Sequence, residues 1–454
     1  MIKKLLSSQL RINMVSGTVT TAVNIVILAV GYPIYLHFLG YERYGVWLVL
    51  TTVLTFARLG NLGIDRAVIK LVAEEYGRGD VVGIERYLMA AISILVLTGS
   101  LVLLLILLFK GQIVDLFGLS GENRKMVLGL LPYVGCLSVY VYVVQAVNAG
   151  VSGLGRMDLA NYVLTAGRAV KVLVASILLY RGRGIESLLI ANTLSYLAIH
   201  ALSVVLMRRI MPLRLIRLVN LRRGCYRRLL SFGGGILGGS LASMLFSPFN
   251  KLILARYVGV DTVPIYDMAY TSSMTVRMFI EAGLRALMPE ISRMDAEKSL
   301  AARRRISSIY ARSMRLVFSL GTPLYLLLMA FAPLLLQIWL RDKFIDTLPG
   351  TFRIMLIGTY FSLLGVPAYH TLMGTGYIRY TLGAHLVQTI VNMALVFALV
   401  AISWVTTTTI GSACALAMAT ATGYLTLQHR RIDRQIGDRS SHNVSRQEGA
   451  TVPA

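Results

Sequence analysis

Residues 38–80 read FLGYERYGVWLVLTTVLTFARLGNLGIDRAVIKLVAEEYGRGD and place Arg58 and Arg66 inside an apolar segment. Another apolar segment, 219 residues further along the chain, carries Arg277 and Arg285 at the same spacing. An arginine in the middle of a bilayer costs on the order of 2.5–3.5 kcal/mol on insertion scales, so such residues usually face a polar cavity or a partner. Paired cations at equivalent places in two halves indicate a transporter of something anionic.

The composition is typical of a polytopic membrane protein. The chain is 56% hydrophobic, and about a dozen apolar stretches approach the roughly 20 residues that cross a bilayer as a helix. We expect an all-α protein with helices at residues 15–38, 44–69, 87–109, 127–149, 159–180, 185–207, 229–255, 264–288, 314–340, 350–372, 380–402 and 405–427. An even number of crossings places both termini on the same side of the membrane.

The distribution of basic residues predicts which side that is. Most of the 45 Lys and Arg residues fall in segments that are cytoplasmic if the amino terminus is cytoplasmic, which is the positive-inside pattern. We therefore expect a multi-pass protein of the cytoplasmic (inner) membrane with both termini in the cytoplasm. The net charge of +24 does not indicate nucleic-acid binding, because the cations follow the membrane boundary instead of forming one basic stripe.

A basic segment at residues 208–228 divides the chain. It reads RRIMPLRLIRLVNLRRGCYRR and contains no acidic residue. Either an amphipathic helix on the anionic inner leaflet or a solvated basic loop accounts for this pattern. We expect an N-terminal lobe at residues 1–207, this linker, a C-terminal lobe at 229–427, and a disordered polar tail at 428–454.

The two lobes show signs of an internal duplication. Gly40 aligns with Gly259 in the register that pairs the arginines, and GLGRMD at Gly153 matches GTGYIR at Gly374 with a shift of two residues. Because an even number of helices separates equivalent positions, the two lobes run in the same direction through the membrane. This is a parallel repeat of the kind found in transporters.

The block from Leu39 to Ile64, with its LG-x-x-x-YG-x-W and LG-x-x-G-[IL] patterns, resembles the Wzx-type polysaccharide and O-antigen flippases. These belong to the multidrug/oligosaccharidyl-lipid/polysaccharide (MOP) exporter superfamily. The resemblance implies a V-shaped pair of six-helix lobes around a central cationic cavity. It also implies export of a polyprenyl-diphosphate-linked oligosaccharide, from the inner to the outer leaflet, by alternating access.

The same resemblance suggests the wider role of the chain. The cargo would serve the assembly of O-antigen, capsule or exopolysaccharide, and the protein would not be an enzyme. Its partners would be the lipid-linked sugar, membrane lipids, and a polysaccharide polymerase with its chain-length machinery. No cofactor is implied, and the three cysteines and six histidines show no metal-ligand spacing.

The arginines are the main candidates for substrate binding, because a planar guanidinium can hold phosphate oxygens in bidentate fashion. Arg58 and Arg277 lie near mid-helix, and Arg66 and Arg285 lie closer to the cytoplasm. On one continuous helix, Arg58 and a carboxylate at Asp65 would share a face. Glu281 would lie in a similar arc beside Arg277, so these two acids are candidates for ion coupling or charge balance. The alternative is that all four arginines form interhelical ion pairs or snorkel to lipid headgroups.

Three further cations are weaker candidates for the same role. Arg168 and Lys171 are three residues apart and share a helix face, and Lys251 follows Pro248, where a helix break would expose backbone. His385 could reach a cavity but is expected in the core.

Two other functions are compatible with parts of the pattern. A multidrug and toxin extruder shares the two-lobe plan but commonly carries cationic drugs, which favours acidic residues in the cavity. A membrane polysaccharide polymerase or glycosyltransferase usually displays catalytic residues on a large outer loop, and no such arrangement is evident here.

Overall fold

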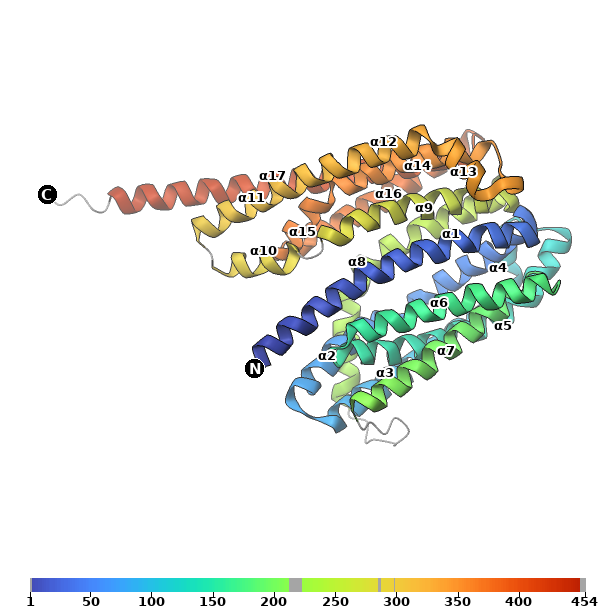
Figure 1. Cartoon of the computed structure of the whole chain (residues 1–454), viewed down its shortest axis with the longest axis horizontal. Helices are drawn as coiled ribbons and strands as arrows, with labels where there is room; N and C mark the ends of the chain where they lie inside the picture. Colours follow the sequence, from blue (N-terminus) through green and yellow to red (C-terminus); the bar gives the residue numbers. More distant parts are fainter. Residues whose placement is uncertain (1, 212–222, 285–286, 298, 450–454) are drawn as a thin grey trace. The chain divides into compact units, whose positions relative to one another are not determined.

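The computed structural model describes residues 2–211, 223–284, 287–297 and 299–449, and these ranges form helices without any β-strand (Figure 1). Most of the predicted basic linker, residues 212–222, lies outside them. The helices before the linker are α1 (Ile2–Ala57), α2 (Ile64–Arg78), α3 (Val81–Leu108), α4 (Lys110–Leu116), α5 (Gly121–Gly153), α6 (Met157–Tyr180) and α7 (Glu186–Ile210). Those after it are α8 (Arg223–Tyr257), α9 (Val263–Leu284), α10 (Leu287–Ala296), α11 (Leu300–Leu316), α12 (Thr322–Ala330), α13 (Ala332–Leu340), α14 (Thr347–Leu364), α15 (Val366–Gly374), α16 (Ile378–Ala401) and α17 (Thr407–Gly449).

Within the described residues, nine helical stretches are long and apolar enough to cross a membrane. The first of them, Ser16–Asn61, contains a sharp turn at Gly40 (φ 68°, ψ −179°) and therefore comprises two of the predicted segments. Helices α8 and α9 cover the two predicted segments that directly follow the linker. The all-α, multi-pass fold expected from the sequence is confirmed.

The chain forms two compact units, which we call unit 1 and unit 2. Unit 1 contains Met1–Met268 with Leu336–Leu348 and Val405–Thr407, and unit 2 contains Ala269–Leu335, Pro349–Trp404 and Thr408–Ala454. Helix α8 therefore groups with unit 1, although the predicted C-terminal lobe began at residue 229. The physical reason is that Cys225 and Leu229 of α8 pack into the apolar core that α2, α3 and α5 form.

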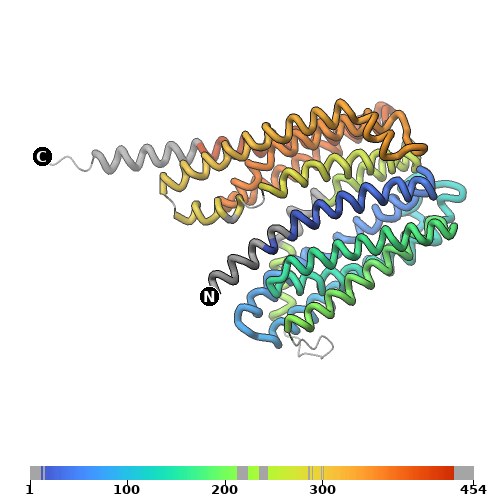
Figure 2. The backbone as a smooth tube through the Cα atoms, in the orientation of Figure 1, coloured from blue at the N-terminus to red at the C-terminus, as the bar shows by residue number. Residues whose placement is uncertain are grey.

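The core of unit 1 lies between long apolar helices. Helices α3 and α5 pack side by side, as do α6 and α7 (Figure 2). Ile64, Leu88 and Tyr142, from three different helices, are fully buried there. The apolar faces of these helices are thus buried against one another.

Backbone geometry supports the internal repeat. Gly155 (φ 81°) and Gly376 (φ 82°), which the repeat pairs, adopt the same left-handed conformation after α5 and α15, respectively. A Cβ atom on Gly153 would lie 2.8 Å from Val72, and one on Gly374 would lie 2.8 Å from Ile291. Val72 and Ile291 are also repeat partners, so equivalent residues make the same close helix contact in both halves.

The end of α17 differs from the prediction. Residues from Gln428 onward were expected to be disordered, but the helix continues to Gly449. The ring of His429 stacks on Tyr310 with centroids 4.2 Å apart, and Ile432 is buried in a core cluster of unit 2. The stack on Tyr310 of α11 and the burial of Ile432 explain why the first turns of the polar tail are helical.

Candidate functional site

Arg58 lies where a membrane helix breaks. α1 ends at Ala57, a short 3-10 turn follows at Arg58–Asn61, and Leu62 (φ 53°) and Gly63 (φ 70°) then adopt left-handed conformations. Such residues end a helix. The expected continuous helix over 44–69 is therefore interrupted, and Asp65 does not share a helix face with Arg58.

Two side chains from α5 hold this broken segment. The Tyr142 hydroxyl donates to the carbonyl oxygen of Ala57, and Gln145 accepts a hydrogen bond from Asn61 at 3.1 Å. Backbone groups freed by a helix break need such partners inside a membrane. The hydrogen bonds with Tyr142 and Gln145 therefore stabilise the helix break and fix the backbone position of Arg58.

A cavity of about 170 Å³ within unit 1 contains Arg58. Its lining residues come from α1, α5, α6, α7 and the 3-10 turn: Thr51, Leu54, Thr55, Arg58, Ser138, Val141, Tyr142, Lys171, Asn192 and Tyr196. Two of these residues are cations and none is an acid. Among the ion pairs between described residues, none involves Arg58 or Lys171. We call this cavity the unit 1 pocket.

The other predicted cations of the first half, Arg168 and Arg66, do not line the unit 1 pocket. Arg168, one turn before Lys171 on α6, is exposed. Arg66 is exposed at the start of α2, where its backbone N–H donates to the carboxylate of Asp65 at 2.8 Å. Asp65 accordingly lies in the first turn of α2, where a negative charge is favourable, and does not line the pocket.

Lys251 is neutralised by an acid. Its ammonium forms an ion pair with Asp267 of α9, and the Tyr32 hydroxyl donates to the other carboxylate oxygen at 2.6 Å. Asp267 is only 6% exposed. The sequence contains no sign of this pairing, because Asp267 lies sixteen residues from Lys251 on another helix.

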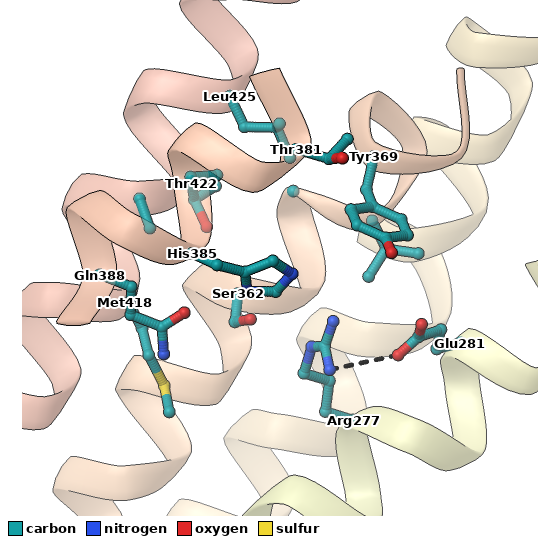
Figure 3. A pocket seen from close by; sticks show the side chains of 14 residues that line it. Arg277, Glu281, Ser362, Tyr369, Thr381, His385, Gln388, Met418, Thr422 and Leu425 are labelled. Carbon is teal, nitrogen blue, oxygen red and sulfur yellow. Dashed lines mark ion pairs between the residues drawn. The ribbon is translucent and has the colours of Figure 1, made fainter. Parts of the chain in front are cut away.

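Arg277 lies in a second cavity, of about 220 Å³, within unit 2 (Figure 3). Helix α9 is unbroken here, so Arg277 pairs with Glu281 one turn later at 3.2 Å, in agreement with the predicted arc. The Nε atom of Arg277 is buried and lacks a hydrogen-bond partner among the described residues. A buried donor without an acceptor costs about 1–3 kcal/mol. The fourth predicted arginine, Arg285, lies outside the described residues.

Polar side chains from α14 to α17 complete this second cavity, which we call the unit 2 pocket. They are Ser362, Tyr369, Thr381, His385, Gln388 and Thr422. His385 thus lines a pocket, although a core position was expected. The spacing of Thr381, His385 and Gln388 places the three on one face of α16, and this spacing is the sequence signal for the polar lining.

Some lining residues of the two pockets are repeat partners, but the two linings differ in charge. Arg58 and Arg277 are one repeat pair, and Val141 and Ser362 are another. Position 62, which corresponds to Glu281, is a leucine in the first half. The lining of the unit 1 pocket therefore contains two cations and no carboxylate, whereas the lining of the unit 2 pocket contains an ion pair. The described residues contain no cluster of three or more His, Cys, Asp or Glu that could hold a metal ion.

Comparison with solved structures shows the fold. An inward-facing MATE-family multidrug resistance transporter of the MOP superfamily superimposes with a TM-score of 0.76 at 14% identity, covering 95% of this chain and 99% of that one. A MOP superfamily transporter from Pyrococcus furiosus, described as having a binding pocket of reversed polarity, gives a TM-score of 0.65 at 13% identity, with 95% and 97% covered. The fold is that of MOP transporters.

Similarity in sequence identifies a narrower group of proteins than the fold does. The chain is 21% identical over 383 residues to a protein of Shigella flexneri named "Putative O-antigen transporter", covering 81% of this chain and 87% of that protein. The polysaccharide biosynthesis protein family matches residues 12–295, more than half of the chain. The protein therefore belongs to the polysaccharide biosynthesis protein family.

Proposed function

We propose that the protein moves a polyprenyl-diphosphate-linked oligosaccharide from the inner to the outer leaflet of the cytoplasmic membrane, for assembly of a surface polysaccharide. In this proposal both termini are cytoplasmic, as the distribution of basic residues favours. The protein catalyses no covalent step. It exposes its binding groups to one side of the membrane and then to the other.

The observation that carries the proposal is the charge of the unit 1 pocket. Arg58 and Lys171 line it, and no carboxylate does. A diphosphate would satisfy both cations, because charge-assisted hydrogen bonds from guanidinium and ammonium groups to phosphate oxygens are strong. The Tyr196 hydroxyl lines the same space and can donate a further hydrogen bond, whereas the hydroxyls of Thr51 and Thr55 already donate to backbone carbonyl oxygens.

The charges also weigh against a carrier of cationic drugs. Such a cargo needs an acid that is free to pair with it, yet Glu281 is paired with Arg277 and Asp267 is paired with Lys251. The unit 1 pocket would repel a cation, because nothing in its lining offsets Arg58 and Lys171. An anionic cargo agrees better with this arrangement.

The proposal is tested by deleting the gene and analysing polyprenyl-linked sugars by mass spectrometry, with their leaflet assigned by accessibility to an added glycosidase. We expect a complete repeat unit to accumulate on the inner leaflet and the intact gene to restore its export. An unchanged lipid-linked pool would instead support a drug or metabolite extruder. Accumulation of single, unpolymerised units on the outer leaflet would support a polymerase.

A further inference from the structure

The unit 2 pocket differs from the unit 1 pocket in the kind of ligand that its charges favour. Its one cation, Arg277, is paired with Glu281 at 3.2 Å, so the pocket as a whole is close to neutral. An anion would gain little there, because the carboxylate would repel it. A neutral ligand with many hydroxyl groups would meet no such penalty.

The polar lining offers donors and acceptors that are not engaged by the protein. Across the described ranges, the side chains of Ser362, Gln388 and Thr422 have no hydrogen-bond partner, and the same holds for the buried Nε atom of Arg277. Hydroxyl and amide side chains both donate and accept, as sugar hydroxyls do. Figure 3 shows the Arg277 guanidinium and the His385 ring directed into the same space.

The rest of the pocket lining is an aromatic and aliphatic surface on which a sugar ring can pack. The rings of Tyr369 and His385 lie 6.3 Å apart and nearly perpendicular, and Met418 and Leu425 also face the pocket. A pyranose ring has an apolar C–H face that packs on aromatic and aliphatic groups while its hydroxyls are hydrogen-bonded at the edge. The volume of about 220 Å³ is below the range of about 300–1,000 Å³ for drug-sized ligands, so one sugar ring fits this space better than a chain of sugars.

We propose that the unit 2 pocket is a subsite for one neutral sugar residue of the cargo, held by Gln388, Thr422 and the Arg277–Glu281 pair. This inference rests on the proposed function, because it assumes that the cargo carries sugar. It assigns separate tasks to the two pockets, with the diphosphate bound in unit 1 and the sugar in unit 2.

The test measures binding of defined lipids to the purified full chain in nanodiscs by native mass spectrometry. The probes are undecaprenyl diphosphate alone and the same lipid carrying N-acetylglucosamine or galactose. We expect at least one sugar-bearing lipid to bind the wild-type protein more tightly than the bare diphosphate. The Gln388→Leu, Thr422→Val double variant should bind that sugar-bearing lipid about tenfold more weakly, as expected for two lost hydrogen bonds, and bind the bare diphosphate unchanged.

Matched variants separate this inference from the proposed function. Thr420→Val is the control on the same helix, since Thr420 is exposed and its hydroxyl bonds the Ala417 carbonyl oxygen instead of lining the pocket. Arg58→Gln should weaken binding of all three lipids. Wild-type protein that binds no diphosphate lipid would overturn the proposed function. Equal binding of the bare and both sugar-bearing lipids, or equal loss for all three in the double variant, would overturn the sugar subsite alone.

Discussion

Arg277 pairs with Glu281 one helical turn later, at 3.2 Å, whereas its repeat partner Arg58 is followed at the same distance in sequence by Leu62. Leu62 has a positive φ and ends the helix. The two repeat-related arginines therefore lie in different settings. In unit 1 no carboxylate lines the pocket of the arginine, and in unit 2 a carboxylate pairs with it.

Replacing Arg58 should impair export more than any other single change in the unit 1 pocket. Arg58→Gln removes hydrogen bonds to a charged group, so we expect export to fall about 10- to 100-fold. Arg58→Lys keeps the charge but loses the bidentate fork and should give an intermediate loss. The measurement is the glycosidase-accessible fraction of lipid-linked sugar in intact cells. Arg181→Gln, at an exposed position after α6, is the control and should export normally; an unaffected Arg58→Gln variant would contradict the role of this pocket.

The Arg277–Glu281 pair should show energetic coupling in a double-mutant cycle. Their side chains are only 19% and 15% exposed, so removing one partner leaves a largely buried charge uncompensated. We expect Glu281→Gln or Arg277→Gln alone to lower the free energy of unfolding by about 1–2 kcal/mol, and the double variant to lose less than the sum. Thermal unfolding of the purified protein in one detergent measures this effect. Strictly additive losses would mean that the two groups do not interact in the folded protein.

The buried Asp267 should be more important for stability than for cargo binding. Asp267→Asn leaves the Lys251 ammonium without its counter-ion, and breaking a buried ion pair costs about 3–5 kcal/mol. Tyr32→Phe removes one hydrogen bond to the same carboxylate and should cost about 1.5–3 kcal/mol. Thermal unfolding again provides the measurement. Tyr133→Phe, at a side chain that is 66% exposed, should leave the midpoint unchanged, and a Tyr32→Phe variant as stable as this control would argue against the hydrogen bond.

The two repeat-related glycines should tolerate alanine equally poorly. A Cβ atom at Gly153 or at Gly374 would lie 2.8 Å from a side chain of the packed helix, so we expect each Gly→Ala change to cost about 1–3 kcal/mol through overpacking. Gly129 on α5 has no atom within 4 Å of such a Cβ. Gly129→Ala should therefore be neutral or slightly stabilising, because alanine favours helix. Parallel thermal melts of the three variants test this prediction, which fails if Gly153→Ala behaves like Gly129→Ala.

Much of the fold could be predicted because the bilayer imposes strict rules on sequence. A chain that crosses it must use long apolar helices, so hydropathy alone located the helical segments. The repeat was also visible, since charge in such segments is costly and Arg58 and Arg277 stand out against their neighbours. Gly155 and Gly376, which the second match of the repeat pairs, have almost the same φ, 81° and 82°.

What only the tertiary structure decided depends on packing between segments far apart in sequence. Helical periodicity placed Asp65 beside Arg58, but the chain turns at Leu62 and Gly63, where a Cβ on Gly63 would lie 2.6 Å from the Gly233 carbonyl oxygen of α8. The ion pair between Lys251 and Asp267 likewise depends on tertiary packing. The two residues lie on different helices, so the docking of the helices brings them together, and spacing along either helix does not predict the contact. Sequence by itself determined the membrane class, the duplicated plan and the cations worth testing. Tertiary packing decided which of those cations pair with a carboxylate, because that depends on how the helices dock.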